Sequence, residues 1–224
     1  DSTAIYRHDS IAQTTERVVT RTARGDLEGR FAEPTISGDG DKIAFTLHDA
    51  DHSGDGWDPQ SQVYLTDTDL DLTYSGNTQL MSADSEWNPG NDGSAQPALS
   101  ADGKFLAFTT SATDVITGAH AAEAAADGTD IALRHLSDGR IDGIAEVVAD
   151  VDASDPSISG DGSQVVFTRR SASGGSSLWL FERPKGVYGG GETLRQIASA
   201  DRPSWSAAAP AAVRNPPVYR SAAP

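Results

Sequence analysis

A thirteen-residue pattern that occurs three times constrains the fold of this chain more than any other feature of its sequence. The full copies run from Pro34 to Thr46, Pro97 to Thr109 and Pro156 to Thr168, and a truncated fourth runs from Pro203 to Ser206. Each full copy predicts a short strand, an Asp-Gly turn and a second strand, because such a turn needs a positive φ that Gly adopts without steric cost. The leading Pro removes only one ladder donor, at the start of a strand. The sequence therefore predicts a repeat protein built from β-hairpins.

Two further candidate strands follow each hairpin. The third-strand candidates are 62–67, 130–135 and 177–182, and residues 4–9 align with them at the start of the chain. The fourth-strand candidates are 78–82, 143–149 and 193–197, and residues 16–22 align with these. The repeating unit is thus four antiparallel strands. The shortest spacing, from Pro156 to Pro203, is near the period of a four-stranded propeller blade, and the two longer spacings carry insertions.

These units predict an all-β fold, a β-propeller of four-stranded antiparallel blades, since a single such sheet cannot bury both of its faces alone. The predicted propeller covers residues 1–206, with three full blades at about 33–83, 96–149 and 155–198. A partial or shared blade comes from 4–22 and 202–206, and 207–224 is an Ala/Pro-rich tail or linker. The blades form either a small four-bladed ring or an excerpt from a larger propeller, and we favour the excerpt.

The second strand of each copy alternates small and aromatic residues. We expect the small residues to lie where blades converge and the aromatic rings to face the opposite way, in the core. The sequence leaves open which face meets which neighbour. The small residues are Ala44, Ala107 and Val166, and the aromatic ones are Phe45, Phe108 and Phe167.

Charge and composition exclude several classes of function. The formal net charge is −16, from 33 acidic against 17 basic residues, and such a surface repels nucleic acid and anionic membranes. No apolar run approaches the roughly 18 residues of a membrane-spanning helix. Cysteine is absent, which excludes disulfides and thiolate metal sites. The chain opens with Asp1 rather than Met, so we expect a mature form or an excised segment.

An Asp-rich insertion between the second and third strands of the first unit is a candidate calcium loop. Oxygen-bearing side chains alternate along it and Gly54 stands sixth, which resembles the start of an EF-hand loop. Gln60 departs from that pattern, because a bidentate Glu is expected at the twelfth position. The alternative is a surface turn that binds no metal. The predicted ligands are Asp49, Asp51, Ser53, Asp55 and Asp58.

Other polar residues of the repeat predict structural roles. Asp39, Asp102 and Asp161 recur in the Ser-x-Asp-Gly turns, where an Asp side chain can bond the backbone amides of its own turn. His8 and His135 fall at matching third-strand positions, which also indicates a structural role. No nucleophile elbow, phosphate-binding glycine loop or His-Glu-x-x-His motif occurs, so we name no catalytic residue and no organic cofactor.

The repeat resembles a known family. The pattern Pro-x-Ile-Ser-x-Asp-Gly-x-x-Ile-Ala-Phe-Thr, followed by an Asp-rich loop and a Val-Tyr-Leu-x-Asp strand, is similar to the WD-like propeller repeat of TolB-type proteins over residues 4–206. That superfamily includes periplasmic scaffold proteins, secreted and cell-surface proteins, and the non-catalytic propellers of prolyl-oligopeptidase-like enzymes. The resemblance implies a β-propeller outside the cytoplasm, usually bacterial, and it implies no particular reaction.

We therefore expect a non-enzymatic binding or scaffold module, secreted or periplasmic, that holds a protein or peptide partner and is stabilised by calcium. Nucleic-acid binding and membrane insertion are not expected. One alternative is a propeller enzyme, or the non-catalytic propeller of a larger hydrolase. Another is a structural surface or appendage component whose incomplete blade is completed by assembly with another chain.

Overall fold

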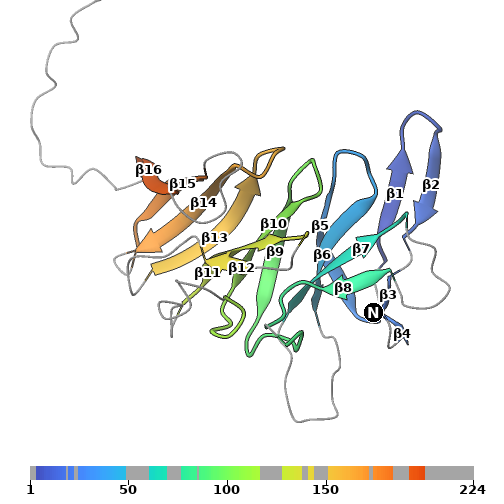
Figure 1. Cartoon of the computed structure of the whole chain (residues 1–224), viewed down its shortest axis with the longest axis horizontal. Helices are drawn as coiled ribbons and strands as arrows, with labels where there is room; N and C mark the ends of the chain where they lie inside the picture. The colour runs from blue at the N-terminus through green and yellow to red at the C-terminus, as the bar shows by residue number, and fades with distance from the viewer. Residues whose placement is uncertain are drawn as a thin grey trace, which may run out of the picture.

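Three four-stranded antiparallel sheets make up most of the described chain (Figure 1). The structure is a computed structural model that describes residues 4–18, 20–22, 25–48, 61–69, 77–84, 86–116, 128–137, 141–143, 151–171, 174–183 and 192–199. In each sheet the strands lie in chain order. Blade 1 contains β5 (Arg30–Ile36), β6 (Lys42–His48), β7 (Gln62–Asp67) and β8 (Thr78–Leu80). Blade 2 contains β9 (Ser94–Leu99), β10 (Phe105–Thr110), β11 (Asp130–His135) and β12 (Ile141–Gly143). Blade 3 contains β13 (Val151–Ile158), β14 (Gln164–Ser171), β15 (Ser176–Glu182) and β16 (Thr193–Ser199).

The predicted all-β propeller architecture is confirmed, and β7 and β11 have the predicted bounds. The fourth strand of blade 2 starts earlier in the chain than the sequence predicts. The prediction is 143–149, but β12 ends at Gly143, and 144–149 lie outside the described residues. The five residues between β11 and β12 are a usual hairpin length, so pairing with β11 begins earlier than the apolar alternation after Gly143 indicates.

The segment before blade 1 forms two short hairpins. Strands β1 (Tyr6–Asp9) and β2 (Thr14–Arg17) pair with each other, as do β3 (Arg21–Thr22) and β4 (Gly25–Asp26). A single strand over 16–22 was therefore wrong. The N–H of Val18 still bonds the Ile5 carbonyl at 2.9 Å, but the Thr20 carbonyl accepts from the N–H of Leu27 instead.

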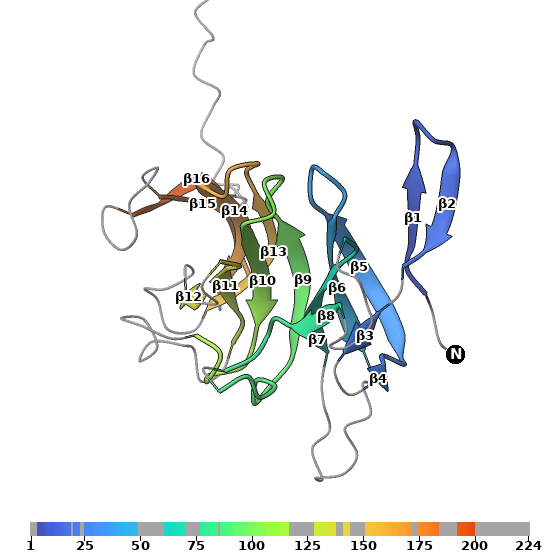
Figure 2. The same ribbon diagram turned by 45° about the vertical axis from the view of Figure 1, so that its right-hand side comes forward.

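The sheets stand side by side in an open row. The hairpin β1–β2 lies at one end of this row and blade 3 at the other, as Figures 1 and 2 both show. The first strands β5, β9 and β13 contact one another across the blade boundaries, and each of β9 and β13 also packs on the second strand of the blade before it. We call the side of the row where these first strands meet the inner edge.

The core lies between successive sheets and has a fixed direction. Phe108 of blade 2 packs in one buried cluster with Ala44 of blade 1, and Phe167 of blade 3 packs in another with Ala107 of blade 2. Phe45 of blade 1 packs in a third cluster with residues of the N-terminal segment. The aromatic face of each blade thus meets the preceding neighbour, and the small-residue face meets the following one. Burying one such ring is worth about 1.5–3 kcal/mol.

The Asp-Gly turns have the predicted backbone geometry. Gly40, Gly103 and Gly162 have φ of 86°, 63° and 67°, in the left-handed region that favours glycine. Their surroundings differ, because a Cβ at Gly40 would meet nothing within 4 Å, whereas a Cβ at Gly162 would overlap the Phe105 ring of the preceding blade. The Arg183 guanidinium covers that ring at 4.0 Å from its centroid. The Phe105 ring therefore has little room to move away from a Cβ at position 162.

We predict that Gly162→Ala destabilises the protein more than Gly40→Ala does. Both variants carry the left-handed backbone cost of about 1–2 kcal/mol for a residue with a Cβ. Gly162→Ala adds an overpacking cost of about 1–3 kcal/mol at the boundary of blades 2 and 3. Urea unfolding of both variants and the wild type measures the difference. Equal losses would contradict the close approach of Gly162 to Phe105.

Candidate functional site

One residue of each blade stands out at the inner edge. Glu33, Gln96 and Asp155 each precede the Pro of their repeat, and their φ values are 52°, 56° and 56°. Positive φ is uncommon outside glycine, and a residue before proline usually adopts an extended conformation. The ladder between the first and second strands changes register at each of these positions, which marks a β-bulge. Bulges redirect side chains and often lie next to functional sites.

Hydrogen bonds join these three residues, which we call the inner row, from blade to blade. The Glu33 carboxylate accepts the Thr46 hydroxyl and the backbone N–H of Gln96, both at 2.8 Å. The Gln96 side-chain oxygen accepts the Thr109 hydroxyl and the backbone N–H of Asp155, both at 2.9 Å. The Gln96 amide nitrogen also donates to Asp155 Oδ1 at 2.9 Å. Glu33 and Gln96 are therefore each tied to their own second strand and to the next blade, and Asp155 is tied to the blade before it.

The inner row presents acceptor groups to solvent. Glu33 and Asp155 are exposed and Gln96 is half-buried, so two carboxylates lie on the open side of the first strands. Their backbone positions are fixed by the bulges and by the bonds between blades. Such an arrangement can accept hydrogen bonds from ammonium, guanidinium or amide donors of a partner. In the sequence, the signal for these positions is a polar residue before the proline of every full copy.

The Asp-Gly turns place their aspartates as predicted. Asp39 Oδ1 accepts the Ser37 hydroxyl at 2.5 Å and the backbone N–H of Asp41 at 3.2 Å. The Ser37 hydroxyl, followed by the Asp41 amide, lowers the pKa of the Asp39 carboxyl below its ordinary value of 3.8. Asp102 and Asp161 make the same pair of bonds within their own turns. These carboxylates thus organise their turns, as the sequence predicted.

The two histidines that were predicted to be structural lie in different environments. His135 is buried in blade 2, with its ring edge-on to Phe105 at 5.0 Å and its Nε2 3.4 Å from the Arg183 guanidinium. This burial confirms its packing role. His8 is exposed in the β1–β2 hairpin, where Nδ1 lies 2.9 Å from the Thr15 hydroxyl. The fold does not bring the two rings together.

A buried arginine at the outer side of blades 1 and 2 was missed from the sequence. Arg134 is 2% exposed, donates to the Met81 carbonyl and lies 4.4 Å from the ring centroid of Trp87. Burial lowers the pKa of Arg134 to about 10, so the guanidinium stays charged at neutral pH. Trp87 is 54% exposed, and this cation–π contact positions its ring on the surface.

The predicted calcium ligands, Asp49, Asp51, Ser53, Asp55 and Asp58, all lie outside the described residues. Within the described ranges, no group of three or more His, Asp or Glu side chains is placed to hold a metal ion. In those same ranges, no helix has the length and apolarity needed to cross a membrane. Calcium binding therefore stays a prediction.

Comparison with solved structures identifies the fold. The chain is similar to TolB from Acinetobacter baumannii, with 16% identity and a TM-score of 0.52 over 88% of this chain and 38% of that one. It is also similar to a structure of prolyl endopeptidases, with 14% identity and a TM-score of 0.50 over 88% of this chain and 26% of that one. The fold is thus that of a TolB-like β-propeller, and the chain spans well under half the length of either structure. No family model matches the sequence, and no curated protein matches it.

We predict that Gln96→Ala lowers the free energy of unfolding by about 1–3 kcal/mol, because it leaves the Asp155 N–H and the Thr109 hydroxyl without their acceptor. Gln79→Ala is the matched control, since Gln79 is exposed on β8, and surface changes usually stay within about 0.5 kcal/mol. Urea unfolding of the two variants gives the comparison. A loss no larger for Gln96→Ala than for Gln79→Ala would show that the inner row does not stabilise the blade boundary.

We also predict that Ca²⁺ raises the unfolding temperature of the wild type and not that of Asp51→Ala. A ligand that binds only the native state stabilises it by about 2.7 kcal/mol at one hundred times its dissociation constant. Thermal unfolding with Ca²⁺ and then with EDTA measures the effect. Asp152→Ala, which removes an exposed aspartate from β13, controls for the loss of one charge. If the wild type does not respond, the Asp-rich loop is a turn without a metal.

Proposed function

We propose that this chain is a non-enzymatic β-propeller module that binds a protein or peptide partner at its inner edge. The observation that carries the proposal is the inner row, in which the exposed carboxylates of Glu33 and Asp155 flank the half-buried Gln96 across three successive first strands. A peptide that runs across these strands meets one carboxylate on blade 1 and a second on blade 3, so repetition of the blade provides repeated contacts. The propeller fold supports this proposal as a scaffold, while the fold alone assigns no partner.

The chemistry of the inner row favours a basic partner segment. Glu33 and Asp155 supply charged acceptors, and a hydrogen bond to a charged group is worth about 1.5–3 kcal/mol. The net charge of −16 attracts a cationic peptide and speeds its association. Because the bulges fix the backbone at these acceptors, little ordering is needed when a partner binds.

Location and calcium are part of the same proposal. A secreted or periplasmic site is supported by the resemblance of the repeat to TolB-type proteins. Calcium would stabilise the Asp-rich loop of blade 1, and this part of the proposal is supported by the alternating oxygen ligands in the sequence.

The test is binding of fluorescent Lys- and Arg-containing peptides, measured by anisotropy. We predict that Glu33→Gln combined with Asp155→Asn weakens the tightest-binding peptide at least tenfold, since loss of about 1.4 kcal/mol corresponds to that factor. Glu28→Gln combined with Asp69→Asn removes the same charge from exposed sites elsewhere in the described chain. Equal weakening by both pairs would indicate general attraction to an acidic surface and would contradict binding at the inner row.

A further inference from the structure

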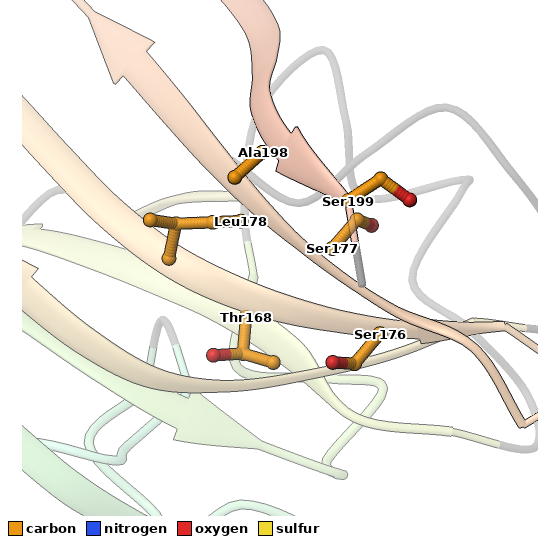
Figure 3. Close-up of a pocket in the computed structure, with 6 residues that line it drawn as sticks. All are labelled: Thr168, Ser176, Ser177, Leu178, Ala198 and Ser199. Carbon is orange, nitrogen blue, oxygen red and sulfur yellow. The ribbon is translucent and has the colours of Figure 1, made fainter. Parts of the chain in front are cut away.

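Blade 3 exposes a face that its equivalents in blades 1 and 2 bury. Val63, Ile131 and Leu178 occupy the same position, because each pairs with the threonine that ends its repeat pattern. Val63 and Ile131 are 0% exposed under the following blade, whereas Leu178 is 36% exposed. A shallow hollow of ≈ 190 Å³ lies beside Leu178 (Figure 3). It is lined by Thr168, Ser176, Ser177, Leu178, Ala198 and Ser199.

The boundary between blades 1 and 2 and the boundary between blades 2 and 3 show which residues lie against the equivalent face. The backbone N–H of Ser94 donates to the Ser61 carbonyl at 2.6 Å, and that of Ala153 donates to the Thr129 carbonyl at 2.8 Å. Ser94 and Ala153 each stand three residues before the Pro of their repeat, and Ser61 and Thr129 each stand just before a third strand. In blade 3 the position of Ser61 and Thr129 belongs to Ser176, which lines the hollow.

The sequence that follows β16 supplies the matching residues. Three residues before Pro203 stands Ala200, directly after Ser199, and Ser199 both ends β16 opposite Ser177 and lines the hollow. Ala200 therefore follows the last residue of β16 directly, at the position where a segment that covers the hollow would begin. The fourth copy continues as Arg202-Pro-Ser-Trp-Ser-Ala207, which matches Gln96-Pro-Ala-Leu-Ser-Ala101 position by position.

Residues 200–224, including the predicted strand at 202–206, lie outside the described residues. We propose that residues 200–207 of this chain dock on the exposed face of blade 3 as the first strand of a fourth sheet. The Ala200 N–H bonds the Ser176 carbonyl, as the equivalent residues do at the two complete boundaries. Arg202 becomes the next member of the inner row. Its N–H and its positive charge face the Asp155 carboxylate, just as the N–H of Asp155 faces Gln96.

The apolar part of the contact comes from Trp205. It occupies the position of Leu99 and Ile158, which pack into the clusters formed with the preceding blade. At the end of the row, Trp205 covers the face that carries Leu178. One chain segment therefore supplies the backbone bond, the charge and the apolar ring that the exposed face requires.

Engineered disulfides test this docking directly, because the chain has no cysteine. A Cβ at Gly38 would lie 3.3 Å from the Ala101 Cβ, and one at Gly160 would lie 3.5 Å from the same Ala101 Cβ. These separations are close to those of disulfide-bonded residues. The next pair in the series is Gly160 with Ala207. We predict that the full chain carrying Gly160→Cys and Ala207→Cys forms an intramolecular disulfide in dilute solution.

Two other pairs calibrate the yield, read on non-reducing gels and by mass spectrometry. Ala101→Cys with Gly160→Cys is the positive control from a described boundary. Gly38→Cys with Ala207→Cys reports random encounters, because Gly38 belongs to blade 1, two blades before the blade of Gly160. A yield for 160/207 near that of the positive control supports the proposal, and a yield equal to that of 38/207 overturns it. Disulfide-linked dimers would also overturn it, because a second copy would then cover the face.

A second measurement needs no cysteine. We expect Trp205→Ala to lower the unfolding temperature by several degrees, because the variant uncovers blade 3, whereas Tyr219→Ala, an aromatic truncation later in the tail, leaves the temperature unchanged. Equal unfolding temperatures for the two variants would overturn docking of Trp205.

Discussion

The structure depends on one kind of buried cluster that recurs with a fixed direction and joins a phenylalanine of one sheet to a small residue of the sheet before it. Phe108 lies in the cluster of Ala44 and Phe167 in that of Ala107. Alanine lets the sheets approach closely, and the ring fills the space between them. Because each sheet offers a ring on one face and a small residue on the other, every sheet needs two neighbours. A row of such sheets therefore ends in an aromatic face on one side and in a small-residue face on the other.

The inner row makes the same neighbour relation specific. Apolar packing is non-directional and tolerates small rotations of one sheet on the next. The bonds from Glu33 to Gln96 and from Gln96 to Asp155 require a backbone N–H at one place, so they fix how each first strand lies on the preceding blade. The cost is backbone strain, since a non-glycine residue with positive φ is disfavoured by about 1–3 kcal/mol. The bonds at each position offset that strain.

The sequence predicted the parts of this fold that depend on local pattern. The hairpins and third strands follow from Asp-Gly turns and alternating apolar residues, so β7 and β11 were placed correctly. The position of β12 was predicted wrongly, because the apolar alternation after Gly143 indicates a later strand than the short connection after β11 allows. The inner row was missed for a different reason. A residue before proline predicts extended backbone. The bonds that hold Gln96 in its left-handed conformation come from Glu33, Thr109 and Asp155, which are distant from it in the sequence.

The two proposals meet at Asp155. If Arg202 docks against this carboxylate, a cation from the chain itself neutralises one end of the inner row, and a basic partner competes with that contact. Glu33, at the other end, then carries the larger share of partner binding. Its Oε2 already accepts both the Thr46 hydroxyl and the Gln96 N–H, which holds the carboxylate in one orientation. Separate substitution of Glu33 and Asp155 would therefore have unequal effects on peptide affinity, and the inequality would itself report whether the fourth copy is docked.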